Sequence, residues 1–548
     1  MNLFQRFQAG QYVADPMLPH LTHDGTLGAF SRGSLRVLLI NPPIREWSFP
    51  NIEPLGQEYV AAAAWMDGHD VRALDLNAER LRPVTGSLSD FTARVERRIA
   101  QALDEHQPQV VGLGGIITQY GWIKRIAALV RQLRPETVLL LGGGIASSIP
   151  RFMAERLPVD VIVLEEGEVT GSEVLARIAA GECCAGIQGT LVNLPGGQIV
   201  DGGLRPSVKP RHEGLDHLPW PLRALWPHDT IYKRNPVGHL NWQSKWVDGA
   251  ARADTPFSVS MIASRGCPYA AKACDYCYAA YLGATYRLRS PADVVDEMQW
   301  LMRRYGARYI HFLDDLLLTD YRWALAFADE IIRRKFEVEW GGTCRTNIAA
   351  DDVLRARREG RPHMLERAYE AGMRHVGYGV ESASPTILKA IDKSGQTLEK
   401  MEVAVQETQR IFGYADCSFM IGSPGETEGT VRETMDFCRR VGLQPEVFFF
   451  TTAYPGTTFW QLALDRGLIT KSVIGQSGPA DDDMIERYFL RLGEQGESVR
   501  TNFSDLPDHE VEALARWAVA ELKPAGSRIR EPHSGEEMGV VGATRADL

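Results

Sequence analysis

No apolar stretch in this sequence is long enough to cross a lipid bilayer. A membrane-spanning helix needs about 18 or more consecutive apolar residues, and even the run that starts at Val138 stops at Ser147. The first thirty residues also lack the basic start and apolar block of a secretory signal, because Pro16, His20 and Asp24 interrupt them. We therefore expect a soluble, cytoplasmic protein with no membrane partner.

Basic residues are in the minority. The chain has 60 Lys and Arg against 70 Asp and Glu, a net charge of −10, and no basic tract. Nucleic-acid binding normally needs a positive surface, so a nucleic-acid partner is not expected. The composition, 44% hydrophobic and 24% charged, is that of a globular protein. A chain of 548 residues exceeds the size of one hydrophobic core, so we expect two or three domains.

Cysteine is scarce, which argues against a disulfide framework. Of eight cysteines, Cys267, Cys274 and Cys277 lie within eleven residues, in the segment SRGCPYAAKACDYCYA. Thiolates hold iron-sulfur clusters, and a cubane held by three of them keeps one iron free of protein ligands. A structural zinc ion, the alternative, normally requires a fourth ligand. Candidates for a distant fourth ligand are Cys344, Cys417 and Cys438.

The first third of the chain alternates short apolar runs with helical patterns. Such near-continuous apolar strands separated by helices predict a doubly wound, Rossmann-like parallel α/β sheet. We expect an N-terminal extension over residues 1–34, this domain over 35–195 and a connector over 196–255. The predicted strands cover residues 36–41, 71–76, 110–114, 138–141 and 159–164.

A second alternating region begins near residue 256. Six strand and helix units predict a partial (β/α)6 barrel of the TIM type over residues 256–469, with reactive groups at the carboxyl ends of its strands. Residues 470–548 are expected to form a small mixed region with one helix at 508–522 and a disordered tail. The predicted strands cover residues 258–262, 309–313, 337–341, 375–379, 417–421 and 446–451.

Three variable segments are expected to shape a substrate pocket: the connector, residues 355–363 and residues 470–503. The connector carries four indole side chains, which could wall a ligand or pack between domains, and packing is favoured. These side chains belong to Trp220, Trp226, Trp242 and Trp246.

The cysteine segment and the predicted strand ends resemble the radical S-adenosylmethionine (SAM) superfamily, specifically the group with an amino-terminal cobalamin-binding domain. The matching pieces are RGCPY before the cysteines, HFLDD at 311–315, CRTN at 344–347, YGVES at 378–382, MIGSPGET at 420–427 and YPGT at 454–457. The family's usual spacing is C-x3-C-x2-C, so this chain carries three extra residues between its first two cysteines. The resemblance implies a [4Fe-4S] cluster on Cys267, Cys274 and Cys277. It implies SAM contacts from Tyr276, Asp314, Arg345, Gly379, Glu381, Gly422, Pro424 and Tyr454.

The first domain resembles the cobalamin-binding domain of the same group, through NPP at 41–43, LGG at 141–143 and EGE at 166–168. Its first loop, PPIREWSFPN, has no histidine, so the lower face of the cobalt is expected to lack one, and His69 is expected to be a turn residue. A dinucleotide is disfavoured because G-x-G-x-x-G is absent after the first strand. A degenerate domain kept for packing is the alternative. The resemblance implies cobalamin contacts from Pro43, Arg45, Trp47, Gly115, Thr118, Gln119, Gly142, Gly143, Gly144, Glu166, Gly167 and Glu168.

The resemblance also implies the reaction. SAM is cleaved reductively to a 5′-deoxyadenosyl radical, and methylcobalamin delivers a methyl group to an unactivated carbon, or phosphorus, of a small-molecule or natural-product intermediate. Electrons come from an external donor of flavodoxin or ferredoxin type. No side chain is assigned as a general base, because the cofactors carry the chemistry. The alternatives are a rearrangement, ring contraction or oxidative cyclisation without methyl transfer, and a non-catalytic iron-sulfur or corrinoid-binding protein.

Overall fold

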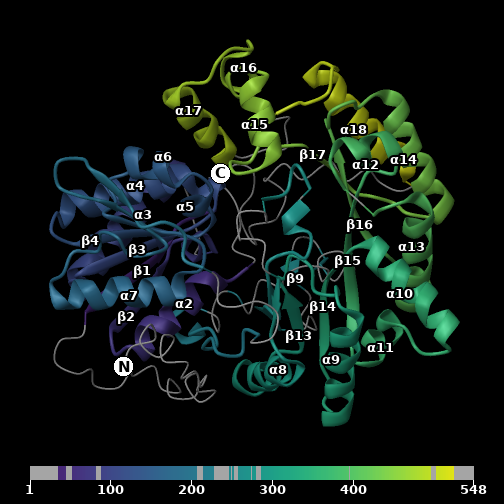
Figure 1. The fold of residues 1–548 in the computed structure, drawn as a ribbon, viewed down its shortest axis with the longest axis horizontal. Helices are drawn as coiled ribbons and strands as arrows, with labels where there is room; N and C mark the ends of the chain where they lie inside the picture. Colours follow the sequence, from purple (N-terminus) through teal and green to yellow (C-terminus); the bar gives the residue numbers. More distant parts are fainter. Residues whose placement is uncertain are drawn as a thin grey trace.

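The computed structural model describes residues 35–44, 52–81, 88–206, 214–227, 232, 246–247, 250–251, 257–272, 274–278, 286–393, 395–494 and 501–523. These residues form two α/β units that lie side by side, with a helical arm across the top of both (Figure 1). Among them, no helix is long and apolar enough to span a lipid bilayer.

The first unit is built on a seven-stranded sheet of order β2-β1-β3-β4-β5-β6-β7. Strands β1 to β5 are parallel, as the sequence predicts. Strands β6 and β7 add an antiparallel hairpin that the sequence analysis did not predict, so this sheet continues past residue 195 to Asp201. The strands are β1 (Arg36–Asn41), β2 (Asp70–Asp75), β3 (Val110–Gly114), β4 (Val138–Gly142), β5 (Val161–Val163), β6 (Thr190–Asn193) and β7 (Ile199–Asp201).

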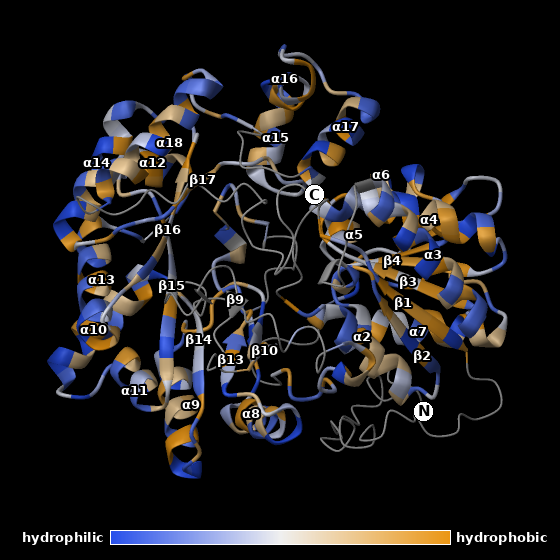
Figure 2. Cartoon of the chain, turned by 180° about the vertical axis from the view of Figure 1, so that it is seen from behind, coloured by the Kyte–Doolittle hydropathy of each residue, from blue (hydrophilic) through white to orange (hydrophobic). Residues whose placement is uncertain are grey.

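Helices cover both faces of this sheet, and its central strands are the most apolar part of the unit (Figure 2). Two separate clusters of buried side chains lie against the two faces, one including Leu38 and Ile40 and the other including Val37 and Leu39. Successive residues of β1 thus enter opposite cores, as strand geometry requires. The helices are α2 (Leu55–Met66), α3 (Leu88–His106), α4 (Tyr120–Leu133), α5 (Gly144–Ser148), α6 (Pro150–Arg156) and α7 (Gly167–Ala180).

The second unit is an open parallel sheet of order β10-β13-β14-β15-β16-β17, which confirms the predicted partial barrel. The strands are β10 (Ser258–Met261), β13 (Tyr309–Phe312), β14 (Glu339–Cys344), β15 (Met373–Glu381), β16 (Asp416–Ile421) and β17 (Phe448–Phe450). Helices line its outer side (Figure 1). They are α8 (Pro291–Tyr305), α9 (Tyr321–Arg334), α10 (Thr346–Glu359), α11 (Met364–Glu370), α12 (Pro385–Ala390), α13 (Leu398–Phe412) and α14 (Glu428–Val441).

Four of the barrel helices start at residues of the type that caps a helix N-terminus. Side chains of Ser290, Asp320, Thr397 and Thr427 accept hydrogen bonds from the first turns of α8, α9, α13 and α14. Helix α10 was not predicted. Its buried face consists of small side chains such as Ala349, Val353 and Ala356, so its apolar periodicity is weak.

The C-terminal helices that the structure describes divide between the two units. Helix α17 (Asp482–Gly493) packs on the first unit, where the Phe489 ring lies 5.7 Å from Tyr120 and 5.4 Å from Phe152. Helix α18 (Asp508–Leu522) matches its predicted range and packs on α14 of the barrel. Helices α15 (Thr458–Asp465) and α16 (Leu468–Ile474) lead from the last barrel strand to α17.

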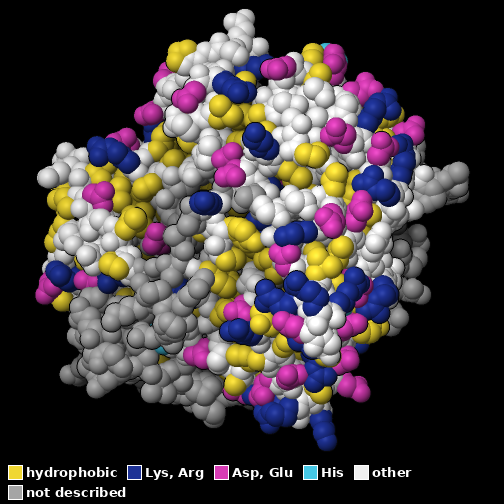
Figure 3. All heavy atoms as spheres, turned by 45° about the vertical axis from the view of Figure 1, so that its right-hand side comes forward, with side chains coloured by type: hydrophobic (Ala, Val, Ile, Leu, Met, Phe, Trp, Pro, Cys, Tyr) yellow, Lys and Arg dark blue, Asp and Glu magenta, His cyan; other side chains and the backbone are white. Residues whose placement is uncertain are grey.

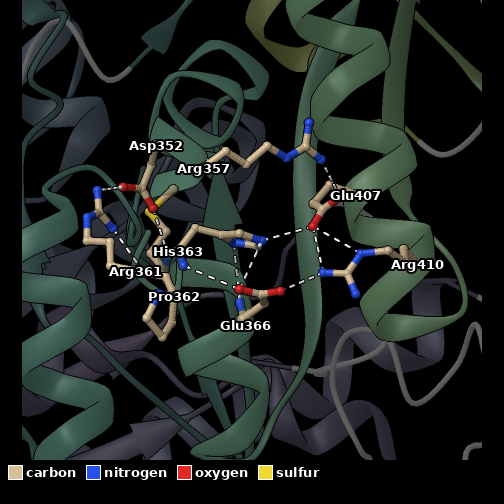
Figure 4. Close-up of polar contacts among 9 residues, drawn as sticks. Asp352, Arg357, Arg361, Pro362, His363, Glu366, Glu407 and Arg410 are labelled. Carbon is tan, nitrogen blue, oxygen red and sulfur yellow. Dashed lines mark hydrogen bonds and ion pairs between the residues drawn. The ribbon is translucent and has the colours of Figure 1, made fainter. Parts of the chain in front are cut away.

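Residues 355–363, expected to shape a pocket, lie instead on the outer side of the barrel, at the end of α10 and the start of α11. Figure 4 shows an ion-pair network there, in which Nε2 of His363 lies 2.9 Å from Glu407 and Arg410 lies 2.6 Å from the same oxygen. Burial raises the pKa of Glu407, but hydrogen bonds from Arg410 and His363 outweigh it and lower the pKa to about 2. This network braces α10, α11 and α13, and acidic and basic side chains are interspersed over the surface of the barrel (Figure 3).

A buried cation joins the two units. The Arg223 guanidinium, fully enclosed, lies 3.5 Å from Glu53 and Glu58 of the first unit and 3.2 Å from Glu297 of α8. Of the connector's indoles, Trp220 and Trp226 are buried in the cores, which confirms packing for these two. The side chains of Trp242 and Trp246 lie outside the described residues.

Candidate active site

The three clustered cysteines lie on one loop at the carboxyl edge of the barrel, directly after the short strand β11 (Ser264–Arg265). Their thiols are half-buried and form no disulfide. The second half of the loop is tied to the barrel through its backbone. The amide of Asp275 donates to the carbonyl of Ile391 over 3.2 Å, and its carbonyl accepts from the amide of Phe459 over 2.9 Å.

The set of ligands suits an iron-sulfur cluster better than a zinc ion. A structural zinc ion normally takes four protein ligands in a closed tetrahedron, whereas a cubane can be held by three thiolates. The suggested distant fourth ligand Cys344 is buried, with its Sγ 3.1 Å from the carbonyl of Leu318. The donor set therefore fits an iron-sulfur cube.

A charged network joins the cysteine loop to the end of β15. The hydroxyl of Tyr276 donates to Oε1 of Glu381 over 3.0 Å, and Nζ of Lys393 lies 2.7 Å from the same oxygen. Glu381 has a φ of +65°, an uncommon backbone conformation for a residue other than glycine. A Cβ on Gly379 would meet Glu381 Oε1 at 2.4 Å, so a larger residue there would displace the Glu381 carboxylate. Sequence reasoning missed Lys393, whose only signal was its place after the helix that follows YGVES.

Asp314 lies at the end of β13 but turns toward the cysteine loop. Its carboxylate accepts hydrogen bonds from the amide of Ala263 over 3.1 Å and from the hydroxyl of Ser264. Burial raises the pKa of Asp314 to about 6. The structure thus gives Asp314 a role in bracing the approach to the loop, and its contact with SAM stays a prediction.

The turn after β16 contains Gly422 and Pro424. Gly422 has a φ of +90°, which explains the glycine at that position. Two residues beyond the proline, Glu426 is almost fully buried, and burial raises its pKa to about 7. Its Oε1 accepts a hydrogen bond from the hydroxyl of Thr430 over 2.6 Å.

Several buried polar atoms at these strand ends have no hydrogen-bond partner in the described part of the chain. Each such atom costs about 1–3 kcal/mol when it is left unpaired, so native proteins rarely keep several together without a ligand. Their positions after β14, β15 and β16 fit a polar cofactor bound across the barrel edge. The atoms are Oγ1 of Thr346, Oδ1 of Asn347, Oγ of Ser384, Oε1 of Gln396 and Oε2 of Glu426.

The first unit has a second candidate site where its strand order reverses, between β1 and β3. Ligands of doubly wound sheets bind outside the carboxyl ends at this point. Gly143 has a φ of +82°, and a Cβ there would lie 2.8 Å from the carbonyl oxygen of Gly115, whereas Gly142 has open space beside it. The hydroxyl of Thr118 is buried without a partner among the described residues. These glycines and the unpaired hydroxyl fit a large ligand.

The other residues predicted at this crevice have structural contacts of their own. The Gln119 amide donates to the Pro42 carbonyl over 2.7 Å, next to buried Pro43, and Gly144 begins helix α5. Gly167 packs closely against Val60. Arg45 and Trp47 lie outside the described residues. His69 accepts from the amide of Leu35 over 3.2 Å, as expected of a structural residue.

Both carboxylates of the EGE segment form ion pairs. Glu166 is paired with Arg287, and Glu168 with Arg265, two arginines of the barrel unit. The predicted cobalamin contacts of Glu166 and Glu168 stay a prediction.

The two candidate sites touch each other. The hydroxyl of Tyr278, the residue after Cys277, donates to Oγ of Ser148 over 3.2 Å, and Ser148 ends the helix that Gly144 begins. The Tyr278 ring also packs edge-on against Tyr454 at 5.8 Å. The cysteine loop therefore lies directly beside the crevice of the first unit. Sequence spacing could not reveal this contact, because its two residues are 130 positions apart.

Family models match both units. Residues 49–175 match the B12 binding domain, and residues 261–438 match the Radical SAM superfamily. An uncharacterised methyltransferase of Pyrococcus horikoshii is 28% identical over 441 residues, 79% of this chain and 84% of that protein. Cytidylyl-2-hydroxyethylphosphonate methyltransferase of Streptomyces wedmorensis is 24% identical over 473 residues, 79% of this chain and 82% of that protein.

Solved structures share the fold. The radical SAM methyltransferase TsrM from Kitasatospora setae, with cobalamin and a [4Fe-4S] cluster bound, superposes with a TM-score of 0.62 at 21% identity, over 90% of this chain and 91% of that one. The cobalamin-dependent radical enzyme OxsB superposes with a TM-score of 0.56 at 17% identity, over 78% of this chain and 55% of that one.

Fold, cysteine loop and family models together define a two-domain α/β enzyme with one cofactor domain facing a radical SAM barrel. The chain belongs to the cobalamin-dependent radical SAM enzymes. The cofactors of these two domains are cobalamin for the first, and SAM with a [4Fe-4S] cluster for the second.

Proposed function

We propose that this enzyme is a radical SAM methyltransferase that methylates an unactivated carbon, or phosphorus, of a small-molecule or natural-product intermediate. When bound, the cluster and SAM supply a 5′-deoxyadenosyl radical, and cobalamin supplies the methyl group. The observation that carries the proposal is the contact between Tyr278 and Ser148, because it brings the cysteine loop against the B12-binding crevice. A substrate between the two could meet both cofactors without a large domain movement.

The chain's own residues bind the cofactors and orient them. Cys267, Cys274 and Cys277 hold the cluster, while the pair Glu381 and Lys393 offers a carboxylate and an ammonium beside it for the polar groups of SAM. Thr118 and the glycines after β3 and β4 hold the corrin. Helix α17 packs against α4 and the turn that carries Thr118, which helps to exclude water from that end of the crevice. The electrons come from a flavodoxin or ferredoxin type donor.

Relatives support methyl transfer and also keep one alternative open. Several of them are named as methyltransferases or methylases, including the hopanoid C-3 methylase of Methylococcus capsulatus. The anaerobic magnesium-protoporphyrin IX monomethyl ester cyclase of Rubrivivax gelatinosus is 24% identical over 63% of this chain. An oxidative cyclisation without methyl transfer is therefore the second candidate.

The test is an anaerobic reconstitution with iron, sulfide and hydroxocobalamin, followed by SAM and a strong reductant. We expect about four irons per chain, retained corrinoid, and 5′-deoxyadenosine that disappears in the Cys267→Ala, Cys274→Ala and Cys277→Ala variants. Cys183→Ala is the matched control, because Cys183 is exposed and lies outside the loop. Bound zinc, no corrinoid and intact SAM would instead mean a non-catalytic binding protein.

A labelled methyl group separates the two candidate reactions. With SAM carrying a trideuterated methyl group, methyl transfer yields S-adenosylhomocysteine and corrinoid or product that is three mass units heavier. Formation of 5′-deoxyadenosine without any S-adenosylhomocysteine would contradict methyl transfer and favour cyclisation or rearrangement.

A further inference from the structure

The first half of the cysteine loop is held to the barrel by a tyrosine side chain. Tyr269 lies two residues after Cys267, and the guanidinium carbon of Arg345 lies 4.0 Å from the centre of its ring. Nδ2 of Asn347 donates to the Tyr269 hydroxyl over 3.0 Å. We call Tyr269, Arg345 and Asn347 the tyrosine clamp.

Both partners of Tyr269 are fixed on the barrel wall. Arg345 directly follows β14, and its carbonyl accepts from the amide of Ala349 in the first turn of α10. Arg345 is only 5% exposed and Asn347 only 7%. The Tyr269 side chain, which stacks on Arg345 and accepts a hydrogen bond from Asn347, is therefore held in a single position.

The extra residues of the loop lie between two anchored points. Backbone bonds through Asp275 anchor the segment with Cys274 and Cys277, and the tyrosine clamp anchors the segment with Cys267. Between them, residues Ala270–Lys272 form a 3-10 turn that starts with a bond from the Ala270 amide to the Cys267 carbonyl, and Lys272 is exposed. The added length can therefore be taken up at the surface while the cysteines stay in place.

We propose that Arg345 and Asn347 are positioning residues that fix Cys267 through Tyr269, and that this clamp compensates for the six-residue spacing between Cys267 and Cys274. Without it, Cys267 would be tied to the second anchor by a longer and looser segment, and its bond to iron would open more often. The proposal deepens the proposed function, since it rests on the three cysteines holding the cluster.

The rate of iron release reports how firmly the tyrosine clamp holds Cys267. Anaerobically reconstituted protein is mixed with a ferrous chelator, and electron paramagnetic resonance spectra of the reduced cluster are recorded with and without SAM. Tyr269→Phe removes one hydrogen bond, and we expect iron release roughly fivefold faster. Tyr269→Leu also removes the stacked ring, and we expect release roughly thirtyfold faster together with an altered spectrum.

The matched control is Tyr414→Phe, which deletes a hydroxyl bonded to the Arg374 carbonyl at the opposite end of the same sheet. Its iron release and spectrum should equal those of the wild type. Arg345→Lys keeps the charge but loses the planar stack. It should release iron faster than the wild type but more slowly than Tyr269→Leu, because the hydrogen bond from Asn347 remains, and it serves as the test if Tyr269→Leu fails to fold.

Unchanged iron release and an unchanged spectrum in Tyr269→Phe and Arg345→Lys would overturn the proposal. So would the same acceleration in Tyr414→Phe, because the effect would then reflect general loosening. The proposed function is judged separately, because a wild type that holds its cluster but never cleaves SAM contradicts that function. In that case the rate of iron release still tests whether the tyrosine clamp fixes Cys267.

Discussion

Arg265 and Glu168 form an ion pair across the boundary between the barrel and the B12-binding domain. Nη1 of Arg265 lies 3.2 Å from Oε2 of Glu168, and the guanidinium also lies over the ring of Tyr59 at 5.0 Å. Arg265 stands two residues before Cys267, so the first domain directly contacts the approach to the cluster loop. The relative position of the two cofactor sites thus depends on a few buried charges.

Replacing Arg265 should destabilise the whole enzyme. Arg265→Met leaves Glu168 buried without its cation, and breaking a buried pair in this way costs about 3–5 kcal/mol. The double variant Arg265→Met with Glu168→Met should recover much of the loss. Urea unfolding measures both, with Arg151→Met as control, because Arg151 is exposed and pairs with exposed Glu155. A single variant as stable as this control would show that the pair is unimportant.

The variant Arg223→Met should be clearly less stable than the wild type. The buried carboxylates of Glu53, Glu58 and Glu297 lose the guanidinium that they share. Breaking a buried ion pair in this way costs about 3–5 kcal/mol. Urea unfolding measures the loss, with Arg440→Met as control, because Arg440 is exposed. A loss no larger than that of the control would contradict this account.

Glu426→Gln should be more stable than the wild type at alkaline pH. The pKa of Glu426 is raised from 4.5 to about 7 by burial, so the folded state holds a proton that the unfolded state has lost between these values. Stability from this group is present below about pH 4.5 and lost as pH rises through 7. The glutamine variant lacks this loss, which amounts to about 3 kcal/mol at most. Thermal unfolding of apo-protein at pH 5 and pH 8 measures it, and parallel pH profiles would refute it.

Lys393→Met should weaken SAM binding by roughly tenfold, because Glu381 then loses the ammonium beside it. Calorimetry on cluster-loaded protein measures the affinity, and Lys389→Met, an exposed neighbour on α12, is the control. Lys393→Arg should retain part of the affinity, since it keeps the charge. Equal affinity in the Met variant and the control would remove Lys393 from the SAM site.

The parallel strands of both sheets and the cysteine loop could be predicted because their signals are local. Apolar runs such as Arg36–Asn41 and the spacing of Cys267, Cys274 and Cys277 are read within a few residues. Prediction failed where the local signal was weak. Strand β14 (Glu339–Cys344) was predicted too early in the chain, at residues 337–341, because Gly341 and Gly342 lie inside it. Gly341 is needed there because an added Cβ would lie 2.1 Å from the Tyr309 hydroxyl.

The sequence by itself determined the two domain types, the loop of three cysteines and the order of the strand-end motifs, since each of these is carried by neighbouring residues. The tertiary structure alone decided that Glu166 and Glu168 pair with Arg287 and Arg265, that Lys393 joins Glu381, and that the cluster loop touches Ser148. Several of these contacts join residues about a hundred positions apart, so they depend on how the two domains pack and leave no periodic trace in the chain.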